Sequence, residues 1–198
     1  MTRRLRVLAR EARHSRVVRG DGRADAVRAG LEAVYRGTNR FLHDLGVRYW
    51  LVYGTLLGYH REGRLLEGDR DVDFGAHEHE YARIWRARAM LPAGFRMYDT
   101  SRKHHGPKLY VVHRSWEADI YFYRDADGLL QSYEKSRNAG DMAPFPRDFV
   151  FPLRAVTFLG EPTTVPCRPE AYLVHTYRYI GRDAVKDPKT GYWSPKGS

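Results

Sequence analysis

The most restrictive feature of the sequence is an alternation of acidic and apolar residues at positions 69–74, which read Asp-Arg-Asp-Val-Asp-Phe. Side chains two residues apart on a β-strand point to the same face. A strand at this position therefore presents Asp71 and Asp73 together on one face and turns Val72 and Phe74 into a core. The chain must fold so that this strand has one buried apolar face and one face that can use two carboxylates.

The Asp71–Asp73 pair has a chemical consequence. Two strand positions span about 6–7 Å of backbone, and like charges held so close repel unless a cation lies between them. Carboxylate oxygens are hard ligands that suit Mg²⁺ or Mn²⁺, and Mg²⁺ commonly takes its remaining ligands from water and substrate phosphates. We therefore expect Asp71 and Asp73 to bind Mg²⁺ or Mn²⁺, with two ions if a third acid joins them.

Asp119 is the best candidate for the third acid. It lies in the sequence Glu-Ala-Asp-Ile-Tyr-Phe at positions 117–122, which alternates as a strand should. If this strand pairs with the strand at 69–74, Asp119 comes to lie beside Asp71 and Asp73. Glu117 would share the same face and is the alternative.

A Gly-Thr step supplies the expected phosphate site. Residues 47–53 are rich in aromatic and β-branched residues and predict a buried strand that ends at Gly54-Thr55. A strand that ends in glycine and enters a helix exposes backbone N–H groups to which a phosphate can bind. The hydroxyl of Thr55 would add a donor. A phosphate site followed by a metal site on consecutive strands is typical of phosphoryl or nucleotidyl transfer.

The remaining pattern predicts an α+β fold, with a mixed β-sheet flanked by helices. Apolar spacing predicts a helix over 25–45, and Asp-Gly at 127–128 predicts a hairpin turn. The segment from 144 onward is rich in Pro and aromatics and shows one further helix before a closing loop at 186–198. The other expected elements are helices at 56–61, 78–91 and 169–180 and strands at 95–98, 108–113, 118–123 and 129–133.

Charge divides the chain into a basic N-terminal tail, residues 1–23, and a single domain, residues 24–198. The net charge is +10, and the tail alone holds eight arginines against two acids. The tail is either a solvated segment or a helix on an anionic membrane surface. Residues 1–23 lack the apolar stretch of a signal peptide, so we expect a cytoplasmic protein, with peripheral contact at the inner face of the membrane as the alternative. No specific nucleic acid is expected as a partner.

Other chemistry-bearing residues give weaker signals. Lys103, Lys108 and the His104-His105 pair favour a solvated loop over a donor-binding site, because Gly106-Pro107 marks a turn. His77 and His79 lack the further ligands of a zinc site. Cys167 has no neighbouring base and is expected to be a packed residue.

The motif as a whole resembles the LicD/fukutin-like family of the nucleotidyltransferase-fold superfamily. The resemblance rests on Gly-Thr-Leu-Leu-Gly at 54–58, on Arg61, and on Asp-Arg-Asp-Val-Asp at 69–73. It is strong at 49–75 and looser over the rest of 25–183. Glu67-Gly68 stands where the family usually shows a Pro-Trp pair.

The resemblance implies an α+β fold with a nucleotidyltransferase-like mixed β-sheet flanked by helices. It also implies a metal-dependent transferase. Such enzymes move a phospho-alcohol, such as phosphocholine or phosphoribitol, from a CDP-activated donor to a hydroxyl of a glycan or lipid-linked glycan of the cell envelope. Asp71 and Asp73 would bind metal, and Asp119 would be a third ligand or the base for the acceptor hydroxyl. Gly54, Thr55 and Arg61 would hold the donor phosphates, and Asp69 would orient the site as an outer acid.

Two other functions stay open. The same fold would serve a nucleotidyltransferase that uses an NTP to modify a small molecule, and the two enzymes differ in whether CMP or pyrophosphate is released. A non-enzymatic module would instead bind nucleic acid or anionic membrane through residues 1–23, and its binding would weaken with salt.

Overall fold

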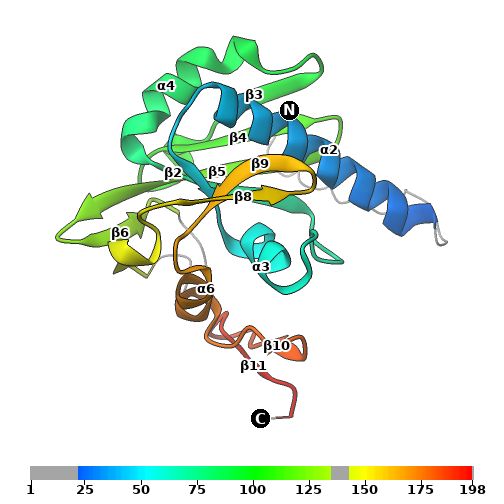
Figure 1. Cartoon of the computed structure of the whole chain (residues 1–198), viewed down its shortest axis with the longest axis vertical. Coiled ribbons are helices and arrows are strands. Elements are labelled where there is room, and N and C mark those ends of the chain that lie inside the picture. Colours follow the sequence, from blue (N-terminus) through cyan, green and yellow to red (C-terminus); the bar gives the residue numbers. More distant parts are fainter. Residues whose placement is uncertain (1–21, 135–142, 198) are drawn as a thin grey trace.

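The protein is an α+β domain built on a mixed β-sheet (Figure 1). This computed structural model describes residues 22–134 and 143–197. The predicted basic tail, residues 1–23, lies almost wholly outside the described residues. Among the described residues no helix has both the length and the apolar character needed to cross a bilayer.

The central sheet has the strand order β1-β2-β5-β4-β3. The pair β2–β5 is parallel, whereas β1–β2, β5–β4 and β4–β3 are antiparallel, and β6 extends the sheet from β5 to β7. The strands are β1 (Tyr49–Leu51), β2 (Asp71–His77), β3 (Phe95–Asp99), β4 (Lys108–His113), β5 (Trp116–Ala126), β6 (Leu129–Ser132) and β7 (Phe145–Pro146).

Helices cover the two faces of the sheet. The long helix α2 (Gly22–Asp44) and the short helix α4 (Tyr81–Arg86) lie over one face, and α3 (Tyr53–Glu62) and α6 (Pro169–Tyr177) lie over the other (Figure 1). The remaining described helices are single 3₁₀ turns, η1 (Glu78–Glu80), η2 (Ala87–Met90), η3 (Ser101–Lys103) and η4 (Arg147–Phe149).

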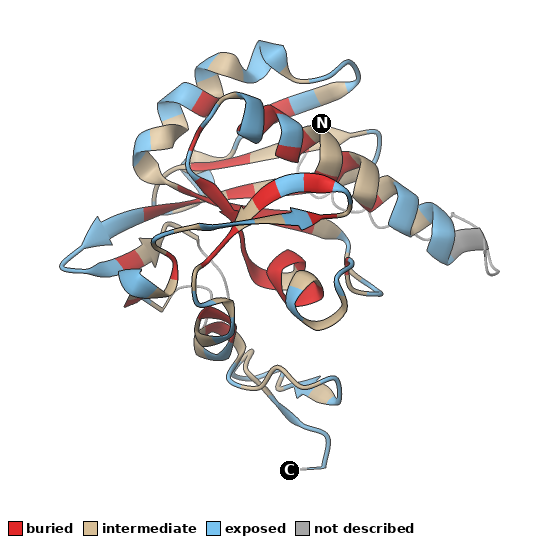
Figure 2. Ribbon diagram, viewed as in Figure 1, coloured by how far each residue is buried: buried red, intermediate tan, exposed pale blue. Residues whose placement is uncertain are grey.

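Part of the core lies between the sheet and α2, and part lies on the other face, against α3 and α6. Val72 and Phe74 of β2 are fully buried, as their alternation with the acids predicts, and the ring of Tyr35 from α2 stacks on Phe74 with 5.8 Å between ring centroids. On the same face Tyr81 packs edge-on against Phe122 of β5. Buried residues are concentrated in the central strands and in α3, with others along α2 (Figure 2). The apolar face of the Asp-x-Asp strand is thus fixed by the core, and the acids are left on the opposite face.

Most predicted elements are present, with shifted ends. The helix expected at 56–61 begins three residues earlier, because Tyr53 adopts a left-handed conformation (φ 47°) that turns the chain from β1 into α3. The strand expected from 69 begins at Asp71, so Asp69 lies in the preceding loop. The hairpin turn at Asp127-Gly128 is confirmed, since both residues have positive φ.

Two hairpins were missed in the C-terminal third. β8 (Arg154–Phe158) pairs with β9 (Glu161–Val165), and β10 (Ala184–Lys186) pairs with β11 (Trp193–Pro195), where a loop had been expected. The first hairpin turns at Leu159-Gly160, both at positive φ. Leucine rarely adopts that conformation, so the turn has no sequence signal. The strands of the second hairpin have three residues each, too few to show alternation.

Candidate functional site

Parallel pairing of β2 and β5 gathers the predicted acids. In the register of this pair Asp73 lies beside Asp119, and Asp71 lies beside Glu117. These residues share the face of the sheet opposite α2, because Val72 and Phe74 face the core. The predicted proximity of Asp119 to the Asp71–Asp73 strand is confirmed.

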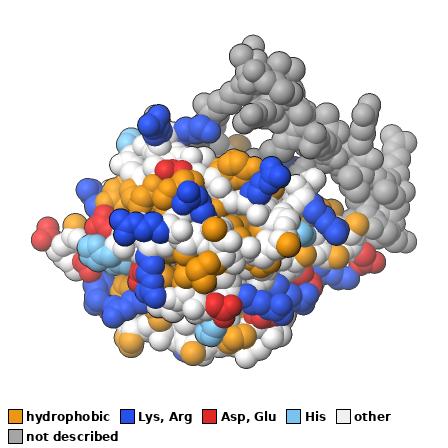
Figure 3. All heavy atoms as spheres, turned by 90° about the horizontal axis from the view of Figure 1, so that it is seen from above, with side chains coloured by type: hydrophobic (Ala, Val, Ile, Leu, Met, Phe, Trp, Pro, Cys, Tyr) orange, Lys and Arg blue, Asp and Glu red, His pale blue; other side chains and the backbone are white. Residues whose placement is uncertain are grey.

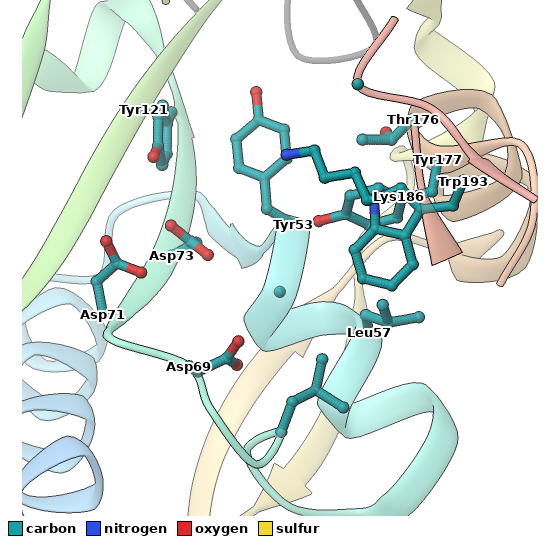
Figure 4. A pocket seen from close by; sticks show the side chains of 13 residues that line it. Tyr53, Leu57, Asp69, Asp71, Asp73, Tyr121, Thr176, Tyr177, Lys186 and Trp193 are labelled. Atoms are coloured by element: carbon teal, nitrogen blue, oxygen red, sulfur yellow. The ribbon is translucent and has the colours of Figure 1, made fainter. Parts of the chain in front are cut away.

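A cavity of about 250 Å³ opens in front of these strands (Figure 4). Asp69, Asp71 and Asp73 lie along one side of it, next to the beginning of α3, and the opposite side is formed by α6 and the β10–β11 hairpin. Asp119 is not among the lining residues, which are Tyr53, Gly54, Leu57, Leu66, Asp69, Asp71, Asp73, Tyr121, Thr176, Tyr177, Lys186, Gly191 and Trp193.

The carboxylates on the acidic side disfavour each other's charge. Burial, together with the neighbouring Asp71, raises the pKa of Asp69 to about 6. Burial and then the charges of Asp71, Asp119 and Asp69 raise the pKa of Asp73 well above its ordinary value. Oδ2 of Asp69 is buried without a hydrogen-bond partner. These acids form a site that a cation would stabilise.

Asp119 has a different environment, because Lys108 lies against it. The ammonium of Lys108 is 3.2 Å from Asp119 Oδ2 and 2.6 Å from Glu134 Oε2, and it lies 4.0 Å from the ring centroid of Tyr121. The hydroxyl of Tyr121 donates to the same Asp119 oxygen at 3.0 Å. Burial opposes the charge of Lys108, but Asp119 and Glu134 outweigh it and raise the lysine pKa.

The interpretation of Lys108 as part of a solvated loop was wrong. It is the first residue of β4 and only 8% exposed. Its neighbours follow the sequence interpretation more closely, since Lys103 and His105 are exposed. Nδ1 of His104 lies 3.4 Å from Oε1 of Glu134, so His104 borders the group formed by Lys108, Asp119 and Glu134.

The start of α3 is the predicted phosphate site. Gly54 lies in its first turn and lines the cavity, and a Cβ at this position would lie 3.4 Å from both carboxylate oxygens of Asp69. That is ordinary van der Waals contact, so the space would admit a methyl group, and Gly54 contributes its backbone to the cavity lining. The first backbone N–H groups of a helix have no partner within the helix and can bind an anion.

Thr55 is placed differently from the expectation. It is fully buried, and its Oγ1 accepts a hydrogen bond of 2.8 Å from the backbone N–H of Asp73. Because the hydroxyl points to β2 and is closed off from the cavity, it supports Asp73 rather than contacting a ligand. This bond joins the beginning of α3 to the Asp-x-Asp strand.

Arg61 also differs from the expected contact with the donor diphosphate. Its guanidinium donates to the carbonyls of Ile180 and Gly181 at 2.6 Å each and lies 5.8 Å from the ring centroid of Trp193. It is absent from the cavity lining. Burial lowers its pKa. Arg61 therefore fixes the end of α3 to the segment that follows α6.

Several lining residues were not identified from the sequence. Tyr53 and Tyr121 meet edge-on with 4.8 Å between ring centroids, and Tyr177 and Trp193 meet at 5.2 Å. Lys186 reaches into the cavity from β10 (Figure 4). Tyr53 and Tyr121 flank the Gly-Thr motif and the Asp119 motif and could have been found as their neighbours. Lys186 and Trp193 come from a hairpin that the pattern does not predict.

The acidic side has the donor chemistry for a divalent cation. Among the described residues no group of three or more His, Cys, Asp or Glu side chains could hold a metal ion. Mg²⁺ often takes one or two carboxylates from the protein and its remaining ligands from phosphates and water. Asp71 and Asp73 fit that pattern, and Asp69 Oδ2 adds an unpartnered oxygen nearby.

Two further sequence candidates remain outside this site. The rings of His77 and His79 lie 4.4 Å apart, but they belong to no group that could hold a metal among the residues described. The thiol of Cys167 donates to the carbonyl of Asp148 at 3.1 Å. It is half-buried, in line with the expected packing role.

No curated protein matches the sequence. Among solved structures, the crystal structure of ANT(2″)-Ia in complex with adenylyl-2″-tobramycin is similar with a TM-score of 0.46 at 13% identity, over 68% of this chain and 67% of that chain. The solution structure of the antibiotic-resistance factor ANT(2″)-Ia gives 0.43 at 13%, over 68% of this chain and 63% of that one.

The family comparison covers the acids and the beginning of α3. A family model described as LicD/FKTN/FKRP, nucleotidyltransferase domain, matches residues 46–168. The matched segment runs from the residues before β1 to the residue before α6 and contains Gly54, Asp71, Asp73 and Asp119. The chain belongs to the LicD/FKTN/FKRP family through this nucleotidyltransferase domain.

Proposed function

We propose that the protein is a metal-dependent transferase that moves a phospho-alcohol from a CDP-activated donor to a hydroxyl of a glycan or cell-envelope acceptor. Family membership indicates a transferase, and the proposal adds the donor, the acceptor and the metal. The alcohol would be choline, ribitol or a similar polyol, and the metal Mg²⁺ or Mn²⁺.

One observation supports this function above the others. Three acids, Asp69, Asp71 and Asp73, line one side of a cavity that is also lined by Gly54 at the beginning of α3. Carboxylates that repel each other attract divalent cations, and the N-terminus of a helix attracts phosphate. A metal-bound diphosphate would bring a cation to the carboxylates and a phosphate to the N-terminus of α3.

The roles of the residues follow from their positions. Asp71 and Asp73 would hold the cation, which neutralises charge on the diphosphate when bound. The acceptor oxygen forms a bond to the phosphorus that carries the alcohol, the bridging P–O bond breaks, and CMP leaves. Asp119 would act as third ligand or take the proton of the acceptor hydroxyl from behind the lining residues, since it does not itself line the cavity. Lys108 and Tyr121 fix its Oδ2 in either role.

Calorimetry tests the proposal. Wild-type protein with Mn²⁺ should bind CDP-choline or CDP-ribitol, and the Asp71→Asn, Asp73→Asn double variant should not. A screen of CDP-linked donors for CMP release then identifies the alcohol. Equal binding by wild type and the double variant would show that the acids do not hold the metal.

The same assay separates the competing functions. Pyrophosphate released from an NTP in place of CMP would identify a nucleotidyltransferase that modifies small molecules. Salt-sensitive binding to polyanions or vesicles that survives the double substitution would support the non-enzymatic module. Figure 3 shows Lys and Arg side chains spread over one face among acidic and apolar ones, which does not favour a polyanion-binding patch on that face.

A further inference from the structure

We propose that the side of the cavity opposite the acids binds the donor nucleotide, with Lys186 on its diphosphate and the Tyr177–Trp193 pair under its base. We call this side the C-terminal wall and define it as Thr176, Tyr177, Lys186, Gly191 and Trp193. The inference rests on the proposed function and specifies how the substrate is recognised.

Charge on the two sides of the cavity is opposite. Lys186 is the one Lys or Arg among the residues that line it, and the acids lie across from it (Figure 4). The Lys186 side chain is exposed, and within the described part of the chain no acid forms an ion pair with it. The site therefore fits a ligand that carries cationic charge at one end and anionic charge at the other, as a metal-bound diphosphate does.

The aromatic pair lies next to this cation. Tyr177 ends α6 and Trp193 begins β11, and their rings are 5.2 Å apart at an interplanar angle of 47°. Both line the cavity. Aromatic rings beside a phosphate-binding cation are a common platform for a nucleobase, since every base offers a flat π-face.

The wall is held in place by the rest of the molecule. Arg61 joins α3 to the carbonyls of Ile180 and Gly181 and lies against Trp193. Within the hairpin, Asp187 accepts hydrogen bonds of 2.8 Å from the Lys189 backbone and the Thr190 hydroxyl. Lys186 and Trp193 are cross-strand partners, so one short ladder positions both. Arg61 is thus a positioning residue for the wall.

The wall also lies outside the family match. That match ends at residue 168, whereas α6, β10 and β11 all follow it. The acids and the beginning of α3 fall within the match. The part of the site shared by the family therefore supplies the chemistry, and the C-terminal segment of this chain supplies the contacts that select the nucleotide.

Calorimetry in the presence of Mn²⁺ tests the proposal by measuring the affinity of the protein for three probes, CDP, CMP and inorganic pyrophosphate. Lys186→Ala should weaken CDP and pyrophosphate about tenfold, because a charge-assisted hydrogen bond is lost, and should affect CMP less. Lys186→Arg should retain most of the affinity. The matched control is Lys189→Ala, an exposed lysine of the same hairpin that does not line the cavity.

The aromatic pair has its own readout. Trp193→Ala should weaken CDP and CMP about tenfold and leave pyrophosphate unchanged, because stacking involves only the base, and Trp193→Phe should keep most of the binding. If wild type binds CDP and Lys186→Ala binds it equally well, the wall does not hold the donor and only this inference fails. If wild type binds neither CDP nor pyrophosphate with Mn²⁺, the proposed function fails with it.

Discussion

Two groups of carboxylates lie close to each other at β2 and β5, and the protein surrounds them with different partners. Asp119 and Glu134 are joined by the ammonium of Lys108 at 3.2 and 2.6 Å. Asp73, beside Asp119 in the neighbouring strand, forms no ion pair with a Lys or Arg among the residues described, and Asp69 Oδ2 has no hydrogen-bond partner. The first group has a cation of the protein between its carboxylates, and in the described ranges Asp73 and Asp69 have none.

The difference indicates where a ligand is needed. Burying a carboxylate without a partner destabilises the folded state, so such groups persist where a bound cation compensates for them. Lys108 forms its ion pairs with Asp119 and Glu134, and its charge offsets only part of the rise in the pKa of Asp73. We therefore expect substitutions in the two groups to have opposite effects on stability.

The largest effect should come from Asp73→Asn. Loss of a carboxylate that holds the metal should lower the rate of CMP release about a thousandfold, a typical effect of removing a group that stabilises the transition state. The same substitution should raise the Tm of metal-free protein, because it removes a buried acid whose pKa is raised by burial. Asp127→Asn, in an exposed turn, is the matched control. If Asp73→Asn loses activity and also has a lower Tm, the carboxylate of Asp73 does not destabilise the metal-free protein and the contrast between the two groups is wrong.

Lys108→Met should act in the opposite direction. It removes the cation that the half-buried Asp119 and Glu134 share, which should reduce the free energy of unfolding by about 3 kcal/mol. Chemical denaturation measures it. The double variant Lys108→Met, Glu134→Gln should recover part of the loss, because one of the unpaired charges is removed as well. If the double variant loses as much as Lys108→Met and Glu134→Gln lose together, the three groups do not act as a cluster.

The sequence predicted the acidic half of the site well, for local reasons. Alternation at 69–74 and at 117–122 placed both strands and their faces, and parallel pairing then brought Asp73 and Asp119 together. Such patterns work because a strand repeats every two residues and a buried face selects apolar side chains. Gly54 was found in the same way, from a glycine at a strand-to-helix junction.

The other half of the site depends on contacts between distant segments. Lys108 lies after Gly106-Pro107, and nothing local shows that β4 places it against Asp119 and Glu134. Lys186 and Trp193 reach the cavity through a hairpin with three-residue strands. Thr55 and Arg61 were identified as functional, but their partners, Asp73 and the carbonyls after α6, are set by tertiary packing.

A smaller effect is expected from removing the hydrogen bond between Thr55 and the backbone of Asp73. Thr55→Val removes the buried oxygen that accepts the Asp73 backbone N–H at 2.8 Å and leaves that donor without a partner. The loss should be about 1–2 kcal/mol of unfolding free energy, with weaker metal-dependent donor binding. Thr55→Ser keeps the oxygen and should lose less in both measurements. Equal losses in the two variants would mean that packing of the methyl group, rather than the hydrogen bond, supports the strand.

The smallest effect should come from Asp69, and it should depend on pH. Its pKa is raised to about 6 in the folded protein from an ordinary value of 3.8, so the folded state favours the protonated form. Stability from this group is fully present below pH 3.8 and is lost as the pH rises through about 6. Asp69→Asn cannot ionise and should therefore stabilise metal-free protein by about 1 kcal/mol at pH 7.5, after allowance for solvent screening, with the gain vanishing near pH 4. Thermal unfolding of both proteins from pH 4 to 7.5 measures the difference, and a gain that is constant with pH would show that the substitution acts through packing. Saturating Mn²⁺ should reduce the gain at pH 7.5, because a bound cation favours the ionised carboxylates of the wild-type site.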